Sequence, residues 1–213
     1  MSGLWLIHLS PPMTGGSMNY FLDLAFSLLM TPRKALSYIT SEEKLKEASL
    51  FWLFVVFLTA LSAFQEGPGL VWQFILVVLF MGFSLLLHSA VTDYIAGLWG
   101  GLGTARGITA GFMAAALPFA FSVFFSLLDM TGLSFLSGCG TFLIGLWSFG
   151  LDVIAISENY RFHMGKSVAI ALAPYGLMVF FFLILAVLMV VAAAIGLSDM
   201  ESMMEVESLL SQL

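Results

Sequence analysis

Residues Val168–Leu197 read VAIALAPYGLMVFFFLILAVLMVVAAAIGL and contain no charged side chain. A helix of about 20 apolar residues is long enough to cross the hydrocarbon core of a bilayer, so this stretch predicts a transmembrane helix. It is longer than one crossing needs, and Pro174 lies near its start. Because proline removes a backbone donor, we expect a kink at Pro174, an interfacial turn before it and the span mostly after it.

Four further apolar stretches precede this one along the chain. They are Ala48–Phe64, Leu70–Leu87 with a continuation toward Trp99, Ile108–Leu128, and Leu133–Leu151 with a continuation to Ile156. None of them alternates apolar and polar residues with a period of two, which excludes a β-barrel. The sequence therefore predicts an all-α membrane protein with five transmembrane helices, the third of which is kinked at Pro118.

The composition excludes several other classes of protein. Of the 213 residues, 61% are hydrophobic and 9% are charged, and the mean hydropathy is +1.05. Soluble domains are about 45–50% apolar and about 25% charged, so a cytosolic globule, a disordered chain and a nucleic-acid binder are excluded. The single cysteine, Cys139, excludes an internal disulfide framework and a cysteine-rich metal site.

The basic residues fall in three regions that five crossings would place on one side of the membrane. These are Arg33, Lys34, Lys44 and Lys46 before the first span, Arg106 between the second and third, and Arg161 and Lys166 between the fourth and fifth. The other side would receive acids alone: Glu66, Asp129, Asp199, Glu201, Glu205 and Glu207. Because Lys and Arg favour the cytoplasmic side, we expect a cytoplasmic N-terminus and an extracytoplasmic C-terminus.

The predicted division of the chain follows from these spans. Residues 1–47 form a cytoplasmic segment, 48–197 a five-helix transmembrane domain, and 198–213 an acidic extracytoplasmic tail. Met1–Ser10 is too short for a signal peptide, and the native start stays open between Met1, Met13 and Met18. Thr40 and Glu43 predict a capping box that opens the first span.

An amphipathic helix is predicted within the N-terminal segment. Between Ser17 and Met30, one apolar stripe is formed by Phe21, Leu24, Ala25, Leu28 and Leu29. Such a stripe is typical of a helix that lies in the membrane interface. Basic side chains near the interface attract anionic lipid, and the predicted headgroup contacts are Arg33, Lys34, Arg106, Arg161 and Lys166.

Glycines mark two features of the third span and the loop before it. The run Gly97–Gly103, which includes Gly100 and Gly101, lacks the Gly-Lys-Ser/Thr ending of a phosphate loop. We interpret it as a tight cytoplasmic turn, in which glycine allows positive φ angles. Gly107 and Gly111 form a GxxxG step that lets helices approach closely. Both packing within the bundle and a homodimer seam fit this step, and we favour the first.

A few ionisable residues at or near membrane depth are the candidate functional site. They are His88, Asp93, Asp152, Glu158 and, just outside, His163. Such groups are costly in a membrane and usually face protein or water, so they could share a vestibule that handles protons or binds a divalent metal such as Zn²⁺ or Mn²⁺. His88 and Asp93 lie about 140° apart around a helix. We favour the alternative, in which these groups make separate interfacial hydrogen bonds.

Three stretches of this chain resemble the Yip1 domain family of small multi-pass membrane proteins. They are Met30–Leu36, the residues from Leu87-His88 through Leu98–Thr104 to Ala114–Pro118, and Leu146–Ile156 followed by Glu158, His163 and Gly165–Ala169. The resemblance implies a five-span bundle with a cytosolic N-terminus. Eukaryotic members are associated with Rab GTPases, but the short N-terminal segment looks more like prokaryotic members. The implied location is therefore a bacterial cytoplasmic membrane.

Two functions remain open from the sequence. The first is a non-enzymatic protein that organises or shapes the membrane, or scaffolds partners; no G-x-S-x-G motif or other nucleophile constellation stands out. The second is a small transporter or channel for an ion, metal or lipid-like solute, using the vestibule of ionisable groups. The predicted partners are the lipid bilayer and a second copy or another membrane protein, with no nucleic acid. No cofactor is predicted, apart from a bound lipid or, less favoured, a divalent metal.

Overall fold

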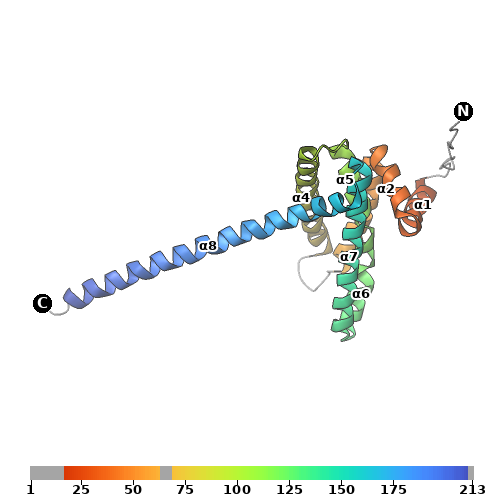
Figure 1. Ribbon diagram of the computed structural model, residues 1–213. Coiled ribbons are helices and arrows are strands. Elements are labelled where there is room, and N and C mark those ends of the chain that lie inside the picture. Colours follow the sequence, from red (N-terminus) through yellow and green to blue (C-terminus); the bar gives the residue numbers. More distant parts are fainter. Residues whose placement is uncertain (1–16, 63–68, 211–213) are drawn as a thin grey trace, which may run out of the picture. The chain divides into compact units, whose positions relative to one another are not determined.

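The computed structural model describes residues 17–62 and 69–210 of the chain. These residues form helices and no strand, which confirms the all-α prediction for the described part of the chain (Figure 1). The elements are α1 (Ser17–Met30), α2 (Pro32–Ser41), α3 (Leu45–Ser62), α4 (Leu70–Leu98), α5 (Ala105–Ala115), the 3-10 helix η1 (Leu117–Phe121), α6 (Ser122–Met130), α7 (Ser134–Tyr160) and α8 (Met164–Leu210). The chain divides into two compact units, with residues up to Ala171 in the first and Leu172 onward in the second.

Within residues 17–62 and 69–210, four helical segments are long and apolar enough to cross a membrane. They are Val71–Leu98, Ala105–Met130, Ser134–Tyr160 and Met164–Ala193. These segments match the second to fifth predicted spans, so the protein is an integral membrane protein with several crossings. The first predicted span corresponds to α3, and its predicted end at Phe64 lies outside the described residues.

The segment before α3 is folded onto the first unit through its apolar side chains. Leu24 and Leu28 of α1 and Leu36 and Ile39 of α2 are buried in the common core. Ala25 is partly buried against the same core, whereas Leu29 is exposed, and the Phe21 side chain lies outside the description. Much of the stripe predicted to contact lipid therefore packs against protein instead.

The turn into α3 differs from the predicted capping box. Thr40 lies inside α2, is buried, and donates through Oγ1 to the carbonyl of Leu36 at 2.9 Å. Glu43 has a positive φ of 48°, and its carboxylate accepts from Thr104 Oγ1 at 2.7 Å. The prediction of a capping box was wrong because α2 continues through Thr40 and packs it against the bundle.

The third predicted span changes from α-helix to 3-10 helix at Pro118. Here α5 ends at Ala115, the 3-10 turn η1 follows with Pro118 at its start, and α6 begins at Ser122. Proline lacks the amide that an α-helix needs at an interior position. The sequence predicted a kink at Pro118, and the structure has a 3-10 turn between two α-helices at this residue.

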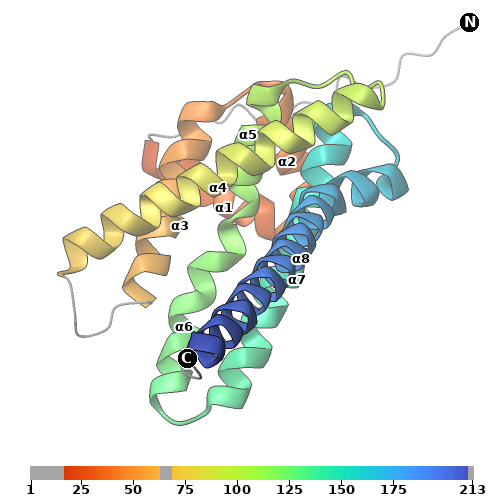
Figure 2. The ribbon, with the colours of Figure 1, turned by 90° about the vertical axis from the view of Figure 1, so that its left-hand side faces the viewer.

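Close contact between α5–α6 and α7 organises the first unit. In Figure 2, α6 and α7 are joined by a turn at the end opposite the α4–α5 loop. Ser148 of α7 donates to the carbonyl of Ala115 at 2.9 Å, and a Cβ added at Gly111 would lie 3.0 Å from the Cβ of Ala155. Gly111 therefore serves packing within the chain, as the favoured interpretation of the GxxxG step predicts.

The helix α8 runs through Pro174 without ending, which contradicts the predicted interfacial turn before that residue. It also continues through the predicted acidic tail as far as Leu210. An isolated proline removes one hydrogen bond, and the many good helix formers on both sides maintain the helix. The kink at Pro174 stays a prediction. Within the second unit, the described apolar side chains from Leu177 to Val191 are exposed all round the helix, as expected for a segment surrounded by lipid.

Candidate functional site

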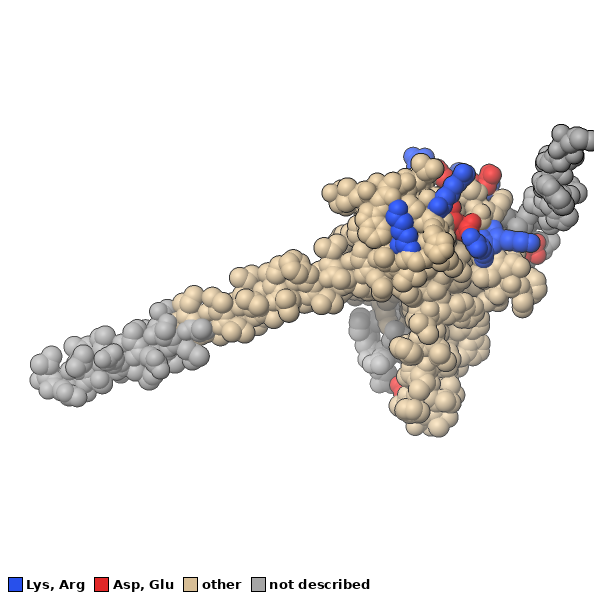
Figure 3. Space-filling model, in the orientation of Figure 1, with Lys and Arg blue, Asp and Glu red and all other residues tan. Residues whose placement is uncertain are grey.

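The three regions that carry the basic residues meet at one end of the first unit. Thr104, in the α4–α5 loop, donates through Oγ1 to Glu43 in the α2–α3 turn at 2.7 Å. Asn159, near the end of α7, donates through Nδ2 to the Thr104 carbonyl at 3.0 Å. We call this part of the first unit the basic end; Figure 3 shows the visible Lys and Arg side chains gathered there. Asp129 is exposed at the end of α6, by the turn into α7.

The α4–α5 loop lies so close to α7 that side chains would not fit at two positions. A Cβ at Gly101 would lie 2.8 Å from Cδ1 of Tyr160, and a Cβ at Gly103 would lie 2.5 Å from the carbonyl oxygen of Asn159. Gly100 has a φ of +77°, which favours glycine. These contacts agree with the predicted tight turn at Gly100 and Gly101.

Lys166 fastens the start of α8 to the same loop. Its ammonium donates to the Trp99 carbonyl at 2.6 Å. The same nitrogen lies 4.1 Å from the ring centroid of Phe162 and 5.6 Å from that of Trp99, within the range of cation–π attraction. Lys166 was predicted to contact headgroups, but its charge is turned toward the protein.

Asp93, a member of the predicted ionisable group, is bound by a residue that the sequence did not single out. The Tyr160 hydroxyl donates to Oδ1 of Asp93 at 2.6 Å and so links α7 to α4. The Tyr160 ring is itself buried and stacks on Phe162 with ring centroids 5.9 Å apart. The carboxylate thus serves as a helix-to-helix contact at the basic end.

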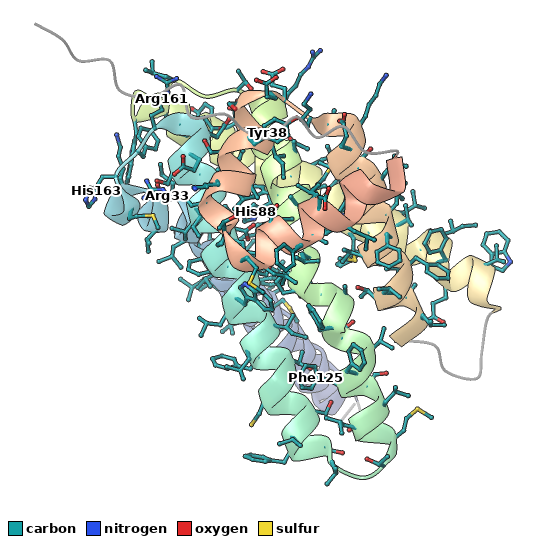
Figure 4. All side chains as sticks on the ribbon, turned by 90° about the vertical axis from the view of Figure 1, so that its right-hand side faces the viewer. Arg33, Tyr38, His88, Phe125, Arg161 and His163 are labelled. Carbon is teal, nitrogen blue, oxygen red and sulfur yellow. The ribbon has the colours of Figure 1, made fainter. Side chains whose placement is uncertain are left out.

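Glu158 makes an ion pair with α2. Arg33 donates through Nε to Oε1 of Glu158 at 2.5 Å, although the two residues are far apart in the chain. A groove of about 430 Å³ lies around this pair, lined by Arg33, Lys34, Ser37, Tyr38, Ser41 and Glu158. Figure 4 shows Arg33 and Tyr38 in the upper part of the first unit, far from Phe125 of α6.

The two histidines lie in different surroundings. His163 is exposed, and its Nδ1 accepts from the backbone amide of Gly165 at 3.3 Å, so it caps the start of α8. The ring of His88 makes an edge-to-face contact with Phe112 of α5, with ring centroids 4.6 Å apart. Asp152 is partly buried on α7, and no hydrogen bond or ion pair joins it to the described residues.

The five predicted ionisable residues therefore lie in different surroundings: four of them have partners of their own, and Asp152 makes no hydrogen bond or ion pair with the described residues. Among the residues that the structure describes, no three His, Cys, Asp or Glu side chains come close enough to hold a metal ion together. The residues that build the basic end were mostly not predicted: Trp99, Thr104, Asn159, Tyr160 and Phe162. The closely spaced glycines from Gly97 to Gly103 were the available signal, since they allow other chain segments to approach.

Known proteins add no assignment to this geometry. No protein family, curated protein sequence or solved structure matches the chain.

Proposed function

We propose that this protein is a non-enzymatic, five-span membrane protein of the Yip1 type whose basic end faces the cytoplasm, where it organises or shapes the membrane or scaffolds partners. One observation carries the proposal. The three regions that contain all seven Lys and Arg residues are joined to each other by direct contacts at one end of the first unit. Basic loops favour the cytoplasmic side of a membrane.

The position of α3 supports a fifth crossing. This helix begins beside Lys44 at the basic end and packs along α4, which returns to the basic end at Leu98. Its 18 residues extend about 27 Å at 1.5 Å per residue, close to the thickness of the hydrocarbon core. Apolar side chains cover both its buried face, with Phe51 and Val55, and its exposed face, with Leu50 and Phe54.

The exposed face of α1 supports a contact with the membrane surface. While Leu24 and Leu28 face the core, a second apolar face with Leu22, Phe26 and Met30 is exposed. A helix with such a face, next to the basic residues of α2, is suited to the cytoplasmic interface. The predicted interfacial helix is therefore retained in the proposal, with lipid contacts made by this second face.

The alternative of a transporter or channel has less support. It requires ionisable side chains free to interact with a solute along one path, whereas Asp93 and Glu158 are engaged with Tyr160 and Arg33. In proteoliposomes we expect no flux of Na⁺, K⁺ or Mn²⁺ above that of protein-free vesicles. Flux that disappears in the His88→Ala, Asp152→Asn double variant would favour transport instead.

The membrane arrangement is tested by labelling single cysteines with an impermeant maleimide in a Cys139→Ser background. Leu102→Cys, in the α4–α5 loop, should react from the cytoplasmic side, and Thr131→Cys, in the α6–α7 turn, from the other side. Glu66→Cys should react from the same side as Thr131→Cys if α3 crosses the membrane. Reaction of Glu66→Cys from the cytoplasmic side would refute the fifth span.

The proposed activity is tested on liposomes viewed by electron microscopy. The reconstituted protein should narrow or tubulate vesicles as the protein-to-lipid ratio rises. A matched control is the same amount of an unrelated helical membrane protein of similar size. Vesicles with unchanged diameters at all ratios would contradict membrane shaping and leave partner scaffolding, which requires co-purification of a specific membrane protein.

A further inference from the structure

We propose that the groove between α2 and Glu158 binds the phosphate of an anionic phospholipid. The inference deepens the proposed function, because it relies on the basic end lying at the cytoplasmic surface of the membrane. It is carried by the donors that line the groove, by the way Arg33 is paired, and by the apolar face that precedes α2.

The groove is lined mainly by hydrogen-bond donors that have no acceptor in the described part of the chain. Lys34 carries three N–H donors, and the hydroxyls of Ser37 and Tyr38 also make no hydrogen bond to described residues. Lys34 is exposed and Ser37 and Tyr38 are partly exposed, and the three lie along one side of α2, away from the buried Leu36 and Ile39. A cluster of donors is complementary to a group that only accepts, such as a phosphate ester.

The ion pair leaves most of the Arg33 guanidinium available. Guanidinium has five N–H donors, and Glu158 takes the one on Nε. Arg33 is 70% exposed, whereas the Glu158 side chain is 18% exposed, so the free edge of the guanidinium faces outward. Two N–H groups of an arginine can bind one phosphate in parallel. Glu158 orients Arg33, but its negative charge also repels a bound phosphate. It should therefore limit the affinity of the groove for the phospholipid.

The apolar face of α1 favours a phospholipid over a free phosphate compound. It is separated from α2 by a single residue, Thr31, and it exposes Leu22, Phe26 and Met30. An anionic lipid whose phosphate occupies the groove could place its acyl chains along this face. A soluble phosphate ester would gain the polar contacts alone.

The test measures binding of phosphatidylglycerol to the full chain in a neutral detergent by native mass spectrometry. Arg33→Gln should weaken binding about tenfold, as expected for the loss of charge-assisted hydrogen bonds. Glu158→Gln should strengthen binding, because it removes the opposing charge and leaves the guanidinium free. Lys46→Gln is the matched control, since Lys46 is an exposed base near the start of α3 but outside the groove; it should change binding less than twofold.

Three outcomes would overturn the site. Equal losses in Arg33→Gln and Lys46→Gln would mean diffuse attraction to the whole basic end, and weaker binding by Glu158→Gln would remove the predicted role of that carboxylate. Displacement of the lipid by glycerol 3-phosphate or inorganic phosphate at matching concentrations would refute the lipid as the ligand. Cysteine labelling of the same variants reports the topology separately, so loss of the site and loss of the proposed membrane arrangement are distinguishable.

Discussion

The hydroxyl of Tyr160 at the end of α7 donates a 2.6 Å hydrogen bond to Oδ1 of Asp93 near the end of α4. This bond joins two long apolar helices at the basic end, beside the glycine loop that connects α4 to α5. Through this contact the carboxylate of Asp93, which lies within a predicted span, helps to hold the two helices together. Several consequences can be measured.

Removal of the Tyr160 hydroxyl should destabilise the protein. In Tyr160→Phe, Asp93 loses its hydrogen-bond partner, and because this carboxylate is only partly buried we expect a loss of about 0.5–1.5 kcal/mol. The measurement is the free energy of unfolding in mixed detergent micelles. Tyr94→Phe is the matched control because Tyr94 is the neighbouring residue and is exposed; it should stay within about 0.5 kcal/mol. If both variants lose the same amount, the hydrogen bond has no special role.

Adding a methyl group should have opposite effects at two glycines of α7. A Cβ at Gly140 would overlap the ring of Phe125 on α6, whereas at Gly138 it would meet nothing within 4 Å. We expect Gly140→Ala to cost about 1–3 kcal/mol through overpacking, and Gly138→Ala to be neutral or to stabilise by up to about 1 kcal/mol through helix propensity. Thermal unfolding in detergent compares the two. Phe125→Leu in the Gly140→Ala background should recover part of the loss.

The α4–α5 loop should be sensitive to substitution at Gly100 in particular. Gly100 has a φ of +77°, while Gly97 one turn earlier lies in α4 with no neighbour within 4 Å of an added Cβ. A left-handed conformation costs a residue with a Cβ about 1–2 kcal/mol, so Gly100→Ala should lower the midpoint of thermal unfolding and Gly97→Ala should not. A lower midpoint in Gly97→Ala alone would contradict this account of the turn.

Loss of the Lys166 ammonium should loosen the same loop. Lys166→Met removes the hydrogen bond to the Trp99 carbonyl and the contact with the Phe162 ring. We expect faster hydrogen exchange in the peptide that covers residues 99–104, with little change in α6. Lys34→Met serves as the control because Lys34 is exposed and, within the described part of the chain, makes no hydrogen bond, ion pair or cation–π contact with residues 99–104. Unchanged exchange in Lys166→Met would show that the glycine packing alone holds the loop.

The sequence predicted the large features of the fold because they depend on one local property. A long apolar run cannot remain in water, and its length fits a bilayer, so four of the predicted spans correspond to long apolar helices. At Pro118 the third span changes to a 3-10 turn, because proline has no amide to donate inside an α-helix. Pro174 shows that the outcome also depends on the surrounding residues, since α8 continues through it. The prediction of a capping box at Thr40 was wrong because the local sequence around a threonine that caps a helix can be the same as around a threonine inside one.

Side-chain partners were much harder to predict. In a soluble helix, the polar face marks the side that faces water, but a helix in lipid is apolar on both its lipid face and its packed face. The hydrophobic pattern of α4 and α7 therefore does not indicate which side of each helix packs against the protein and which side faces lipid. The same ambiguity affected α1, whose predicted lipid stripe contains Leu24 and Leu28, which are buried, while Phe26 and Met30 on another face are exposed.

By itself the sequence determined an all-helical membrane protein, the helices that correspond to four spans, the break at Pro118 and the three regions in which positive charge is concentrated. These features follow from length, apolar composition and proline, all of which act locally. The tertiary structure alone decided that Asp93 binds Tyr160, that Glu158 binds Arg33 and that Lys166 turns toward Trp99. Those pairings join residues far apart in the chain, so no local pattern predicts them. Gly101 and Gly103 let the α4–α5 loop lie against the end of α7, beside the first of these pairs.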